Sequence, residues 1–374
     1  MKGQRFPSEL GTEPCRATAA GRLRLTAHPC INHATYFLQS SITPDGRTLL
    51  FASYRSGVPQ LYSVEDFPGG EIRQWTDGAP LHAFSPAIHP GGDRVFFVRG
   101  GSIWGIDRYS LAERRIVDFG DAQLGEVSLA ENGSWITAAI RKAGQPGLVA
   151  GRADGSSWTF IPFPRTVIHP QFHPLEPEWI EFAGDPAPRM HRVRRDGSGL
   201  ECLYLHGNDE FVVHETFLGA TGDLVYVVWP FALWRMNWQS RERRKICGCN
   251  AWHITPNRAG TSILCDTNHP DRGIFLIDAA TGDERLVCLS EASNQGSQWK
   301  TSRYALPEDF AAARSQVAPG AVSWMETATD TVYGPQWTHP HPSFSPDERR
   351  AIFTSDRSGH PHVYAVDLPP PPHG

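Results

Sequence analysis

The sequence predicts an all-β protein, a β-propeller of seven blades, on three observations. The chain contains 35 Gly, 31 Pro and 12 Trp in 374 residues, a composition typical of many short strands joined by turns. One strand–turn–strand unit recurs about every 40 to 50 residues, which is the length of a propeller blade. Helical periodicity is scarce and is clear only in "PEDFAAARSQV", Pro307–Val317.

The recurring unit is an apolar residue, a turn rich in Pro, Asp and Gly, an apolar strand, a polar loop and a second strand. "ITPDGRTLLFASYRSGVPQLYSVED" and "FSPDERRAIFTSDRSGHPHVYAVD" show it most clearly. Because turn residues stand where strands must reverse, each unit predicts one small antiparallel sheet. The seven copies begin at Ile42, Ile88, Ser128, Phe172, Phe217, Ile254 and Phe344.

The spacing also predicts how the chain is divided. The interval before the last copy is long enough for one blade plus an insertion at 290–335, which would act as a lid. The last copy ends at "DLPPPPHG" and lacks a fourth strand, whereas "GRLRLTAH" at Gly21–His28 resembles the fourth strands of other units. We therefore expect an N-terminal arm at 1–20 and one propeller domain at 21–374, closed by an N-terminal strand in the last blade.

Bulk composition narrows the class of protein. With 40% apolar and 20% charged residues and a net charge of −5, nothing points to a nucleic acid or an anionic membrane as partner. No apolar run approaches the ~20 residues of a membrane span, and no secretory signal is visible, so we expect a cytoplasmic protein. The seven cysteines are expected to be free thiols. The C-x-C pair Cys247 and Cys249 lacks a second pair, so ordinary thiols are favoured over a metal site there.

Histidines stand at matched positions before the first residue of several units. The offset is three residues for His169, His214 and His341, one for His253 and five for His339. Since side chains on a strand alternate with period two, these odd offsets predict that all five rings point the same way, into the channel mouth. Three imidazoles with the amide oxygen of a nearby glutamine are suitable ligands for a divalent ion, without selecting one metal.

A second set of polar residues lies in loops expected between the second and third strands of blades, on the same face. It contains Arg189 and "NHPDRG" with His269 and Arg272. An arginine beside a metal suits a substrate that carries carboxylates. Arg55 and Arg357 sit in the repeat pattern S-x-R-x-G and are interpreted as structural.

The units resemble TolB-like repeats, and the C-terminal stretch "QWTHPHPSFSPD" resembles the metal-binding signature of the oligogalacturonate lyases. The similarity extends over "IHPQFHP", "PRMHRVRRDGS", "VHETF" and "WHITPNRAG". The chain departs from the family in its longer 290–335 insertion and in "ETFLGATG" after His214, where a Trp and a P-D-G turn are expected. The resemblance implies a seven-bladed propeller that uses Mn²⁺ to degrade short pectin fragments inside the cell. It implies His214 as catalytic base, Arg189 as substrate-binding arginine, and four metal ligands, His253, Gln336, His339 and His341.

The implied reaction is β-elimination of a short oligogalacturonide such as digalacturonate, which gives an unsaturated uronate that can open to a keto form. A neutral imidazole would take the proton on carbon 5, and His169 competes with His214 for this role. His169, His269 and Arg272 are expected to contact substrate, and the general acid is not visible. One alternative is a lyase for another uronide. Another is a non-catalytic TolB-like scaffold, which has no need of in-phase imidazoles.

Overall fold

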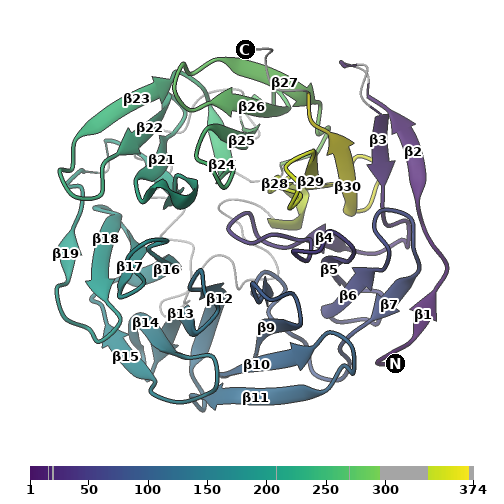
Figure 1. Ribbon diagram of the computed structural model, residues 1–374, viewed down its shortest axis with the longest axis horizontal. Helices are drawn as coiled ribbons and strands as arrows, with labels where there is room; N and C mark the ends of the chain where they lie inside the picture. Colours follow the sequence, from purple (N-terminus) through teal and green to yellow (C-terminus); the bar gives the residue numbers. More distant parts are fainter. Residues whose placement is uncertain (16, 19–20, 208, 269, 295–335, 370–374) are drawn as a thin grey trace.

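A computed structural model describes residues 1–374 apart from 16, 19–20, 208, 269, 295–335 and 370–374. Within these described residues the chain forms seven antiparallel sheets that stand around a ring as blades (Figure 1). The seven-bladed propeller expected from the repeats is therefore confirmed. The predicted helix at Pro307–Val317 and nearly all of the 290–335 insertion lie outside the described residues.

Each blade contains a meander that runs outward from the centre of the ring, and blades one and seven also take strands from the N-terminal segment at their outer edges. The strands of blades one to three are β4 (Asn32–Ala34), β5 (Leu49–Ser53), β6 (Gln60–Val64), β7 (Ile72–Gln74) and β1 (Arg5–Phe6); β8 (Ala87–Ile88), β9 (Arg94–Arg99), β10 (Ser102–Asp107) and β11 (Glu113–Asp118); β12 (Gln123–Leu129), β13 (Trp135–Lys142), β14 (Gln145–Arg152) and β15 (Thr159–Pro162).

The strands of blades four to seven are β16 (Thr166–Phe172), β17 (Trp179–Asp185), β18 (Met190–Arg194) and β19 (Glu201–Cys202); β20 (Val212–Phe217), β21 (Leu224–Val228), β22 (Ala232–Met236) and β23 (Arg243–Cys247); β24 (Ala251–Pro256), β25 (Ser262–Thr267), β26 (Ile274–Asp278) and β27 (Glu284–Cys288); β28 (Ser343–Phe344), β29 (Arg350–Ser355), β30 (His362–Asp367), β3 (Gly21–Arg24) and β2 (Gly11–Pro14). Two described 3₁₀ turns, η1 (Gly219–Thr221) and η4 (Gln336–Thr338), complete the regular structure.

The last blade combines both ends of the chain. β3 pairs antiparallel with β30, with Leu23 opposite Ala365, so the N-terminal strand lies beside the C-terminal strand (Figure 1). Two strands of the N-terminal segment also pair with the ring: β1 pairs with β7 and β2 pairs with β3, each as an outermost fifth strand. These pairings cover sheet edges that would otherwise expose unpaired backbone groups.

Apolar packing between neighbouring blades forms the core. Middle strands read as continuous apolar runs because both of their faces are covered; all five residues of β21, "LVYVV", are buried. One core cluster joins Val225 and Val227 of blade five to Ile254 and Ile263 of blade six. The arginines expected to be structural fit this frame, since Arg55 pairs with Glu9 and Arg357 pairs with Glu291.

The inner strands of blades three to six are each interrupted by a β-bulge. The register with the second strand breaks between Leu124 and Val127, Ile168 and Gln171, Val213 and Thr216, and Ala251 and Ile254. A bulge bends its strand and changes the direction of its side chains. The histidines in these strands are therefore aimed by bulges, and not by the unbroken period-two alternation expected from the sequence.

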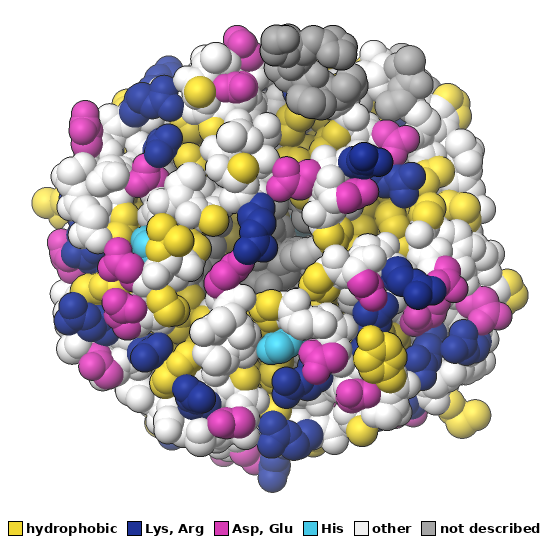
Figure 2. Space-filling model, in the orientation of Figure 1, with side chains coloured by type: hydrophobic (Ala, Val, Ile, Leu, Met, Phe, Trp, Pro, Cys, Tyr) yellow, Lys and Arg dark blue, Asp and Glu magenta, His cyan; other side chains and the backbone are white. Residues whose placement is uncertain are grey.

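One face of the ring is shown in Figure 2. Basic and acidic side chains are interspersed over it, and the centre of the ring is hollowed. In the part of the chain that the structure describes, no helix has the length and apolar character needed to cross a membrane.

Candidate active site

Five buried histidines from blades four to seven meet at the inner strands. They are His169 in β16, His214 in β20, His253 in β24, and His339 and His341 in the segment before β28. None is more than 2% exposed. The ring centroids lie 5.9 Å apart for His169 and His214, 4.5 Å for His214 and His253, and 3.9 Å for His253 and His341. Residues far apart in sequence thus form one imidazole cluster.

Three of these histidines have a backbone conformation that is rare for residues other than glycine. φ is 57° at His169, 55° at His214 and 45° at His341. Such left-handed conformations are costly, and they persist at functional sites where the surrounding structure imposes them. Bulges impose them in β16 and β20. In the last blade His341 stands between Pro340 and Pro342, whose fixed backbone angles stiffen the approach to β28.

His253 is oriented by a buried carboxylate on the next strand. Asp266 of β25 is 1% exposed, and its Oδ2 lies 2.8 Å from Nδ1 of His253. The other oxygen, Oδ1, accepts the backbone N–H of His253 at 2.6 Å. When Asp266 is ionised it only accepts hydrogen bonds, and in that state Nδ1 of His253 carries the proton and Nε2 presents a lone pair. Nε2 of His253 is buried and has no hydrogen-bond partner.

The same carboxylate reaches the C-terminal histidines. Oδ2 of Asp266 accepts the backbone N–H of His341 at 3.3 Å, and Nε2 of His341 is buried without a hydrogen-bond partner. Gln336 begins the 3₁₀ turn η4, and its backbone oxygen accepts the N–H of His339 at 3.1 Å. The side-chain Oε1 of Gln336 is likewise buried without a partner. Because an unpartnered buried acceptor is costly, these atoms indicate a binding site for a cation.

His253, His339 and His341 are close enough to share one ion. Because a metal–imidazole bond measures about 2.1 Å, two rings on one ion have centroids within about 6.5 Å of each other. The centroid of the His253 ring lies 3.9 Å from that of His341 and 5.6 Å from that of His339, and the His339 and His341 rings are 6.0 Å apart. Imidazole nitrogens with an amide oxygen fit a divalent cation.

A tighter group of donor atoms lies elsewhere in blade six. Among the described His, Cys, Asp and Glu residues, the trio with donor atoms all within 4.8 Å of one another is Cys247, Cys249 and Glu284. The histidine nitrogens are more widely spaced than this, so binding one ion requires some rotation of their rings. Glu284 already forms a 2.8 Å ion pair with Arg272. We therefore place the candidate metal centre at the histidines, whose unpartnered atoms are buried.

The cluster has two halves. His253, His339 and His341 form one half with Asp266, and the other is built around Glu215, which follows His214 in the β20 bulge. Glu215 is fully buried and accepts two hydrogen bonds from Arg189, 2.8 Å from Nε and 3.2 Å from Nη2. Its Oε2 lies 3.7 Å from Nδ1 of His169. Burial acts to raise the pKa of Glu215, but the charge of Arg189 and the nearby His169 overcome this and hold the pKa below its ordinary value.

His214 and His169 differ in what surrounds their nitrogens. Nε2 of His169 is 2.9 Å from the hydroxyl of Tyr36, and its Nδ1 faces Glu215. Nδ1 of His214 is buried without a hydrogen-bond partner. Burial, and then the neighbouring His253, lower the pKa of His214 well below its ordinary value, so its imidazole is neutral. Of the two competing histidines, His214 has the environment of a proton acceptor.

The expected substrate contacts do not all reach this cluster. Arg189, just before β18, is buried and bound to Glu215. Arg272 is directed elsewhere, to Glu284 in β27 at the outer edge of blade six. His269 lies outside the described residues.

Several acidic residues of the site were missed in the sequence, namely Asp266, Glu215, Glu126 and Glu181. The backbone N–H of His169 donates to Glu126 in the β12 bulge, and both carboxyl oxygens of Glu181 in β17 are buried without a partner. A signal was present, because each stands alone in a mostly apolar strand, as in "ILCDT" and "WIEFAG". Acidic residues are rarely buried unless they are paired or neutral.

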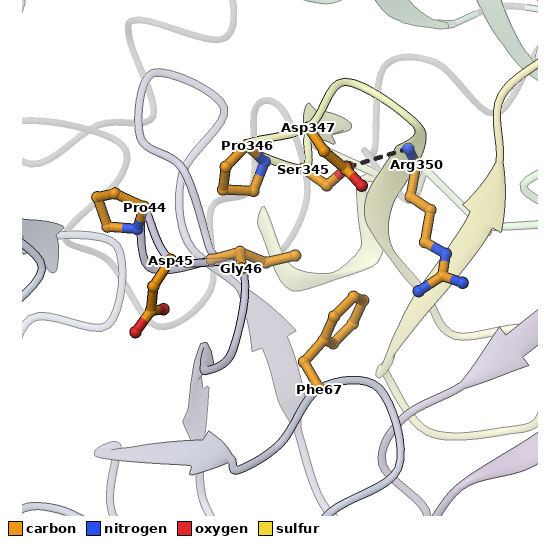
Figure 3. Close-up of a pocket in the computed structure, with 9 residues that line it drawn as sticks. Pro44, Asp45, Gly46, Phe67, Ser345, Pro346, Asp347 and Arg350 are labelled. Atoms are coloured by element: carbon orange, nitrogen blue, oxygen red, sulfur yellow. Dashed lines mark hydrogen bonds between the residues drawn. The ribbon is translucent and has the colours of Figure 1, made fainter.

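A surface pocket of about 460 Å³ lies at the junction of blades seven and one, and none of the clustered histidines lines it. Its walls come from the first turns of both blades, Pro44–Gly46 and Ser345–Asp347, with Phe67 and Arg350 (Figure 3). Asp45 in this pocket accepts a hydrogen bond from Arg108 at 2.8 Å, and Asp347 accepts one from Ser345 at 2.6 Å. The repeated turn residues thus serve packing between blades, and the chemistry is at the histidines.

The chain is similar in sequence to known oligogalacturonate lyases. The family model described as oligogalacturonate lyase matches residues 303–371. The chain is 24% identical over 414 residues to an oligogalacturonate lyase of Dickeya dadantii and 23% identical over 418 residues to an oligogalacturonide lyase of Pectobacterium atrosepticum. Each comparison covers 98% of this chain and 98% of the relative.

Solved structures show the same fold over the whole length. An oligogalacturonate lyase in complex with manganese superposes with a TM-score of 0.81 at 21% identity, covering 98% of both chains. An oligogalacturonate lyase from Vibrio parahaemolyticus gives a TM-score of 0.81 at 20% identity, covering 99% of both chains. The C-terminal family match and the two full-length relatives show that the chain is similar to oligogalacturonate lyases from one end to the other.

Proposed function

We propose that this protein is a carbon–oxygen lyase that cleaves short oligogalacturonides, such as digalacturonate, by metal-dependent β-elimination. The observation that carries the proposal is the set of buried acceptors without partners, Nε2 of His253, Nε2 of His341 and Oε1 of Gln336, beside the neutral imidazole of His214. A non-catalytic scaffold ring gives no reason to bury such atoms unpaired.

His253, Gln336, His339 and His341 would hold the ion, and one solved relative is a complex with manganese. When bound, a divalent cation neutralises the carboxylate of a uronate and so makes the proton on carbon 5 more acidic. Asp266 keeps the Nδ1 proton of His253 in place and thereby fixes the direction of the Nε2 lone pair. It also holds the backbone of His341, which ties the two ligands together.

In the proposed reaction His214 takes the proton from carbon 5. Its pKa is lowered by burial, so the nitrogen is unprotonated at neutral pH and can accept. The electron pair of the C5–H bond forms the C4–C5 double bond, and the bond from carbon 4 to the glycosidic oxygen breaks. The products are an unsaturated uronate and a shortened sugar. No covalent enzyme intermediate is needed.

Arg189 is proposed to attract a substrate carboxylate or the departing oxygen. Glu215 binds the Nε and Nη2 side of the guanidinium, which fixes its plane. The backbone N–H of Arg189 also donates to Nε2 of His206 at 3.0 Å, so the residue is held at both ends. A cytoplasmic location is part of the proposal, and the seven cysteines, all described and none in a disulfide, fit a reducing compartment.

Metal analysis of the purified protein, followed by incubation with digalacturonate, tests the proposal. We expect bound metal and an ultraviolet signal from the unsaturated product. The His214→Ala variant is expected to keep its metal and to lose about 10²–10⁴-fold in kcat, the usual contribution of a general base. His360→Ala, which removes an exposed imidazole of blade seven, is the matched control and should leave kcat unchanged.

Other outcomes separate the alternatives. Metal without turnover of digalacturonate points to another uronide as substrate. Protein with neither metal nor turnover is a scaffold ring, and the proposal is then wrong. Full activity in His214→Ala would move the base to another residue while leaving the reaction in place.

A further inference from the structure

A short turn of blade one crosses the channel and enters the histidine cluster. After β4 ends at Ala34, the chain leaves the blade and returns to it where Ile42 bridges to Leu49. The turn between them, residues 35–41, is closed by the N–H of Gln39 bound to the oxygen of Tyr36 at 2.8 Å. It places the adjacent aromatic side chains of Tyr36 and Phe37 among the histidines.

Other blades hold this turn in place. Oγ1 of Thr255, in blade six, donates to the backbone oxygen of Phe37 at 3.1 Å. Nε2 of Gln39 donates to Oγ of Ser128, in blade three, at 3.3 Å. Because contacts from blades three and six fix the turn, the position of the Tyr36 side chain is built into the ring.

The Tyr36 hydroxyl lies between the two halves of the site. It is 2.9 Å from Nε2 of His169, and the side chain is completely buried. The Tyr36 ring centroid is 5.1 Å from that of His341 and 6.3 Å from that of His253, the candidate metal ligands. A uronate held at those ligands would therefore lie beside the Tyr36 side chain.

β-Elimination needs a proton donor as well as a base, because the departing glycosidic oxygen is strongly basic. His214 is neutral and is the acceptor, His253 and His341 direct lone pairs toward the ion, and Arg189 keeps its proton at any ordinary pH. We propose that Tyr36 is the general acid, a proposal that rests on the lyase function proposed above. The phenol of Tyr36 is a neutral O–H donor, and its side chain is buried in ring contact with His341, beside the candidate ligands.

The proton balance of the step closes. The C5–H bond breaks and its proton goes to His214, the C4–C5 double bond forms, and the C4–O bond breaks as Tyr36 transfers its phenolic proton to the departing oxygen. When the product has left, Tyr36 regains a proton and His214 releases its own, which restores both groups. Glu215 and the bond from the backbone N–H of His169 to Glu126 orient His169, whose Nε2 lies 2.9 Å from the Tyr36 hydroxyl, so His169 is a positioning residue.

The test is the Tyr36→Phe variant of the full-length protein loaded with Mn²⁺. We expect kcat on digalacturonate to fall about 10²–10⁴-fold while KM, metal content and melting temperature stay near those of the parent. With 4-O-(4-nitrophenyl) galacturonate the loss should be much smaller, since nitrophenolate departs without a proton. Tyr364→Phe is the control. It removes the buried phenol oxygen of a β30 residue whose ring stacks on Phe353, and the kcat of this variant should not change.

Three results would overturn the assignment. They are a kcat within threefold of the parent, an equal loss on both substrates, and a loss of activity that follows loss of metal from Tyr36→Phe. A parent protein that turns over neither substrate refutes the proposed function itself. That outcome is distinct from an active parent with an equally active Tyr36→Phe variant, which refutes only the general acid.

Discussion

Two buried carboxylates of the histidine cluster, Glu215 and Asp266, differ in what balances their charge. Glu215 is bound through two hydrogen bonds by the Arg189 guanidinium. Asp266 accepts hydrogen bonds from His253 and from the backbone of His341. Accordingly, burial raises the pKa of Asp266 to about 7, whereas Arg189 keeps the pKa of Glu215 low.

This difference assigns separate roles to the two halves of the site. In the half around Glu215, the Arg189 guanidinium balances the charge of the carboxylate. This half is complete without a ligand, and Glu215 positions Arg189 and His169. Asp266 is bound by the imidazole of His253 and by backbone N–H groups, and we propose that a cation held by His253 and His341 would complete its charge balance. Because a buried charge needs a partner, such an ion would stabilise the protein as well as assist the proposed reaction.

The largest expected effect on stability comes from removing Glu215. Glu215→Ala removes the carboxylate that accepts two hydrogen bonds from the buried Arg189 and leaves its longer ion pair with Asp185 at 3.7 Å; breaking a buried pair in this way costs about 3–5 kcal/mol in the free energy of unfolding. Urea unfolding measures the loss. Glu201→Ala is the control, since Glu201 pairs with Arg192 and Arg241 with 46% of its side chain exposed. Such exposed pairs contribute only about 0–1 kcal/mol. Equal losses in both variants would show that Arg189 does not depend on Glu215.

A smaller effect is expected from removing the charge of Asp266. Asp266→Asn keeps the size of the side chain and an oxygen for the backbone of His253, but loses the negative charge behind this proposed metal ligand. Affinity for Mn²⁺, measured by calorimetric titration, should fall about 10–100-fold, as for other residues that support a ligand from behind. Asp283→Asn removes an exposed charge from the same blade and should bind Mn²⁺ as the parent does. An unchanged affinity in Asp266→Asn would contradict the division into two halves.

The ring was predictable from sequence because each blade repeats the same local code of turn residues and apolar strands. The convergence of His169, His214 and His253 was also expected, but by regular alternation. A bulge adds one residue to one strand of a pair, and this depends on the partner strand, which local sequence does not display. Asp266 and Tyr36 were missed for a related reason. The role of Tyr36 arises from its contact with His169 of blade four, and that of Asp266 in part from its contact with His341 of blade seven; contacts between distant blades and across the closing blade exist only once the ring has formed.

The smallest expected effect concerns the pH dependence of stability and a third buried carboxyl, that of Glu181 in β17. Both of its oxygens are buried without a hydrogen-bond partner, and burial, with the charge of Glu215 added, raises its pKa well above the ordinary value. Glu181 is therefore neutral in the folded protein and ionises on unfolding above pH ~4.3, the pKa of a free glutamate. Folding then takes up a proton, so this residue makes the protein less stable as the pH rises from that value toward its folded pKa.

Glu181→Gln removes this dependence on pH. Between pH 5 and 6 the parent should lose up to about 1.4 kcal/mol of unfolding free energy through Glu181, the limit for one proton per pH unit, and the variant should lose less. Urea unfolding at the two pH values gives the slopes. Glu201→Gln is the control. Hydrogen bonds from Arg192 and Arg241 outweigh partial burial and lower the pKa of Glu201, so this residue changes the stability with pH only below pH ~4.3. Glu201→Gln should therefore keep the parental slope. An unchanged slope in Glu181→Gln would mean that Glu181 is ionised in the fold, and the cluster would then contain a carboxylate whose counter-charge must come from a bound cation.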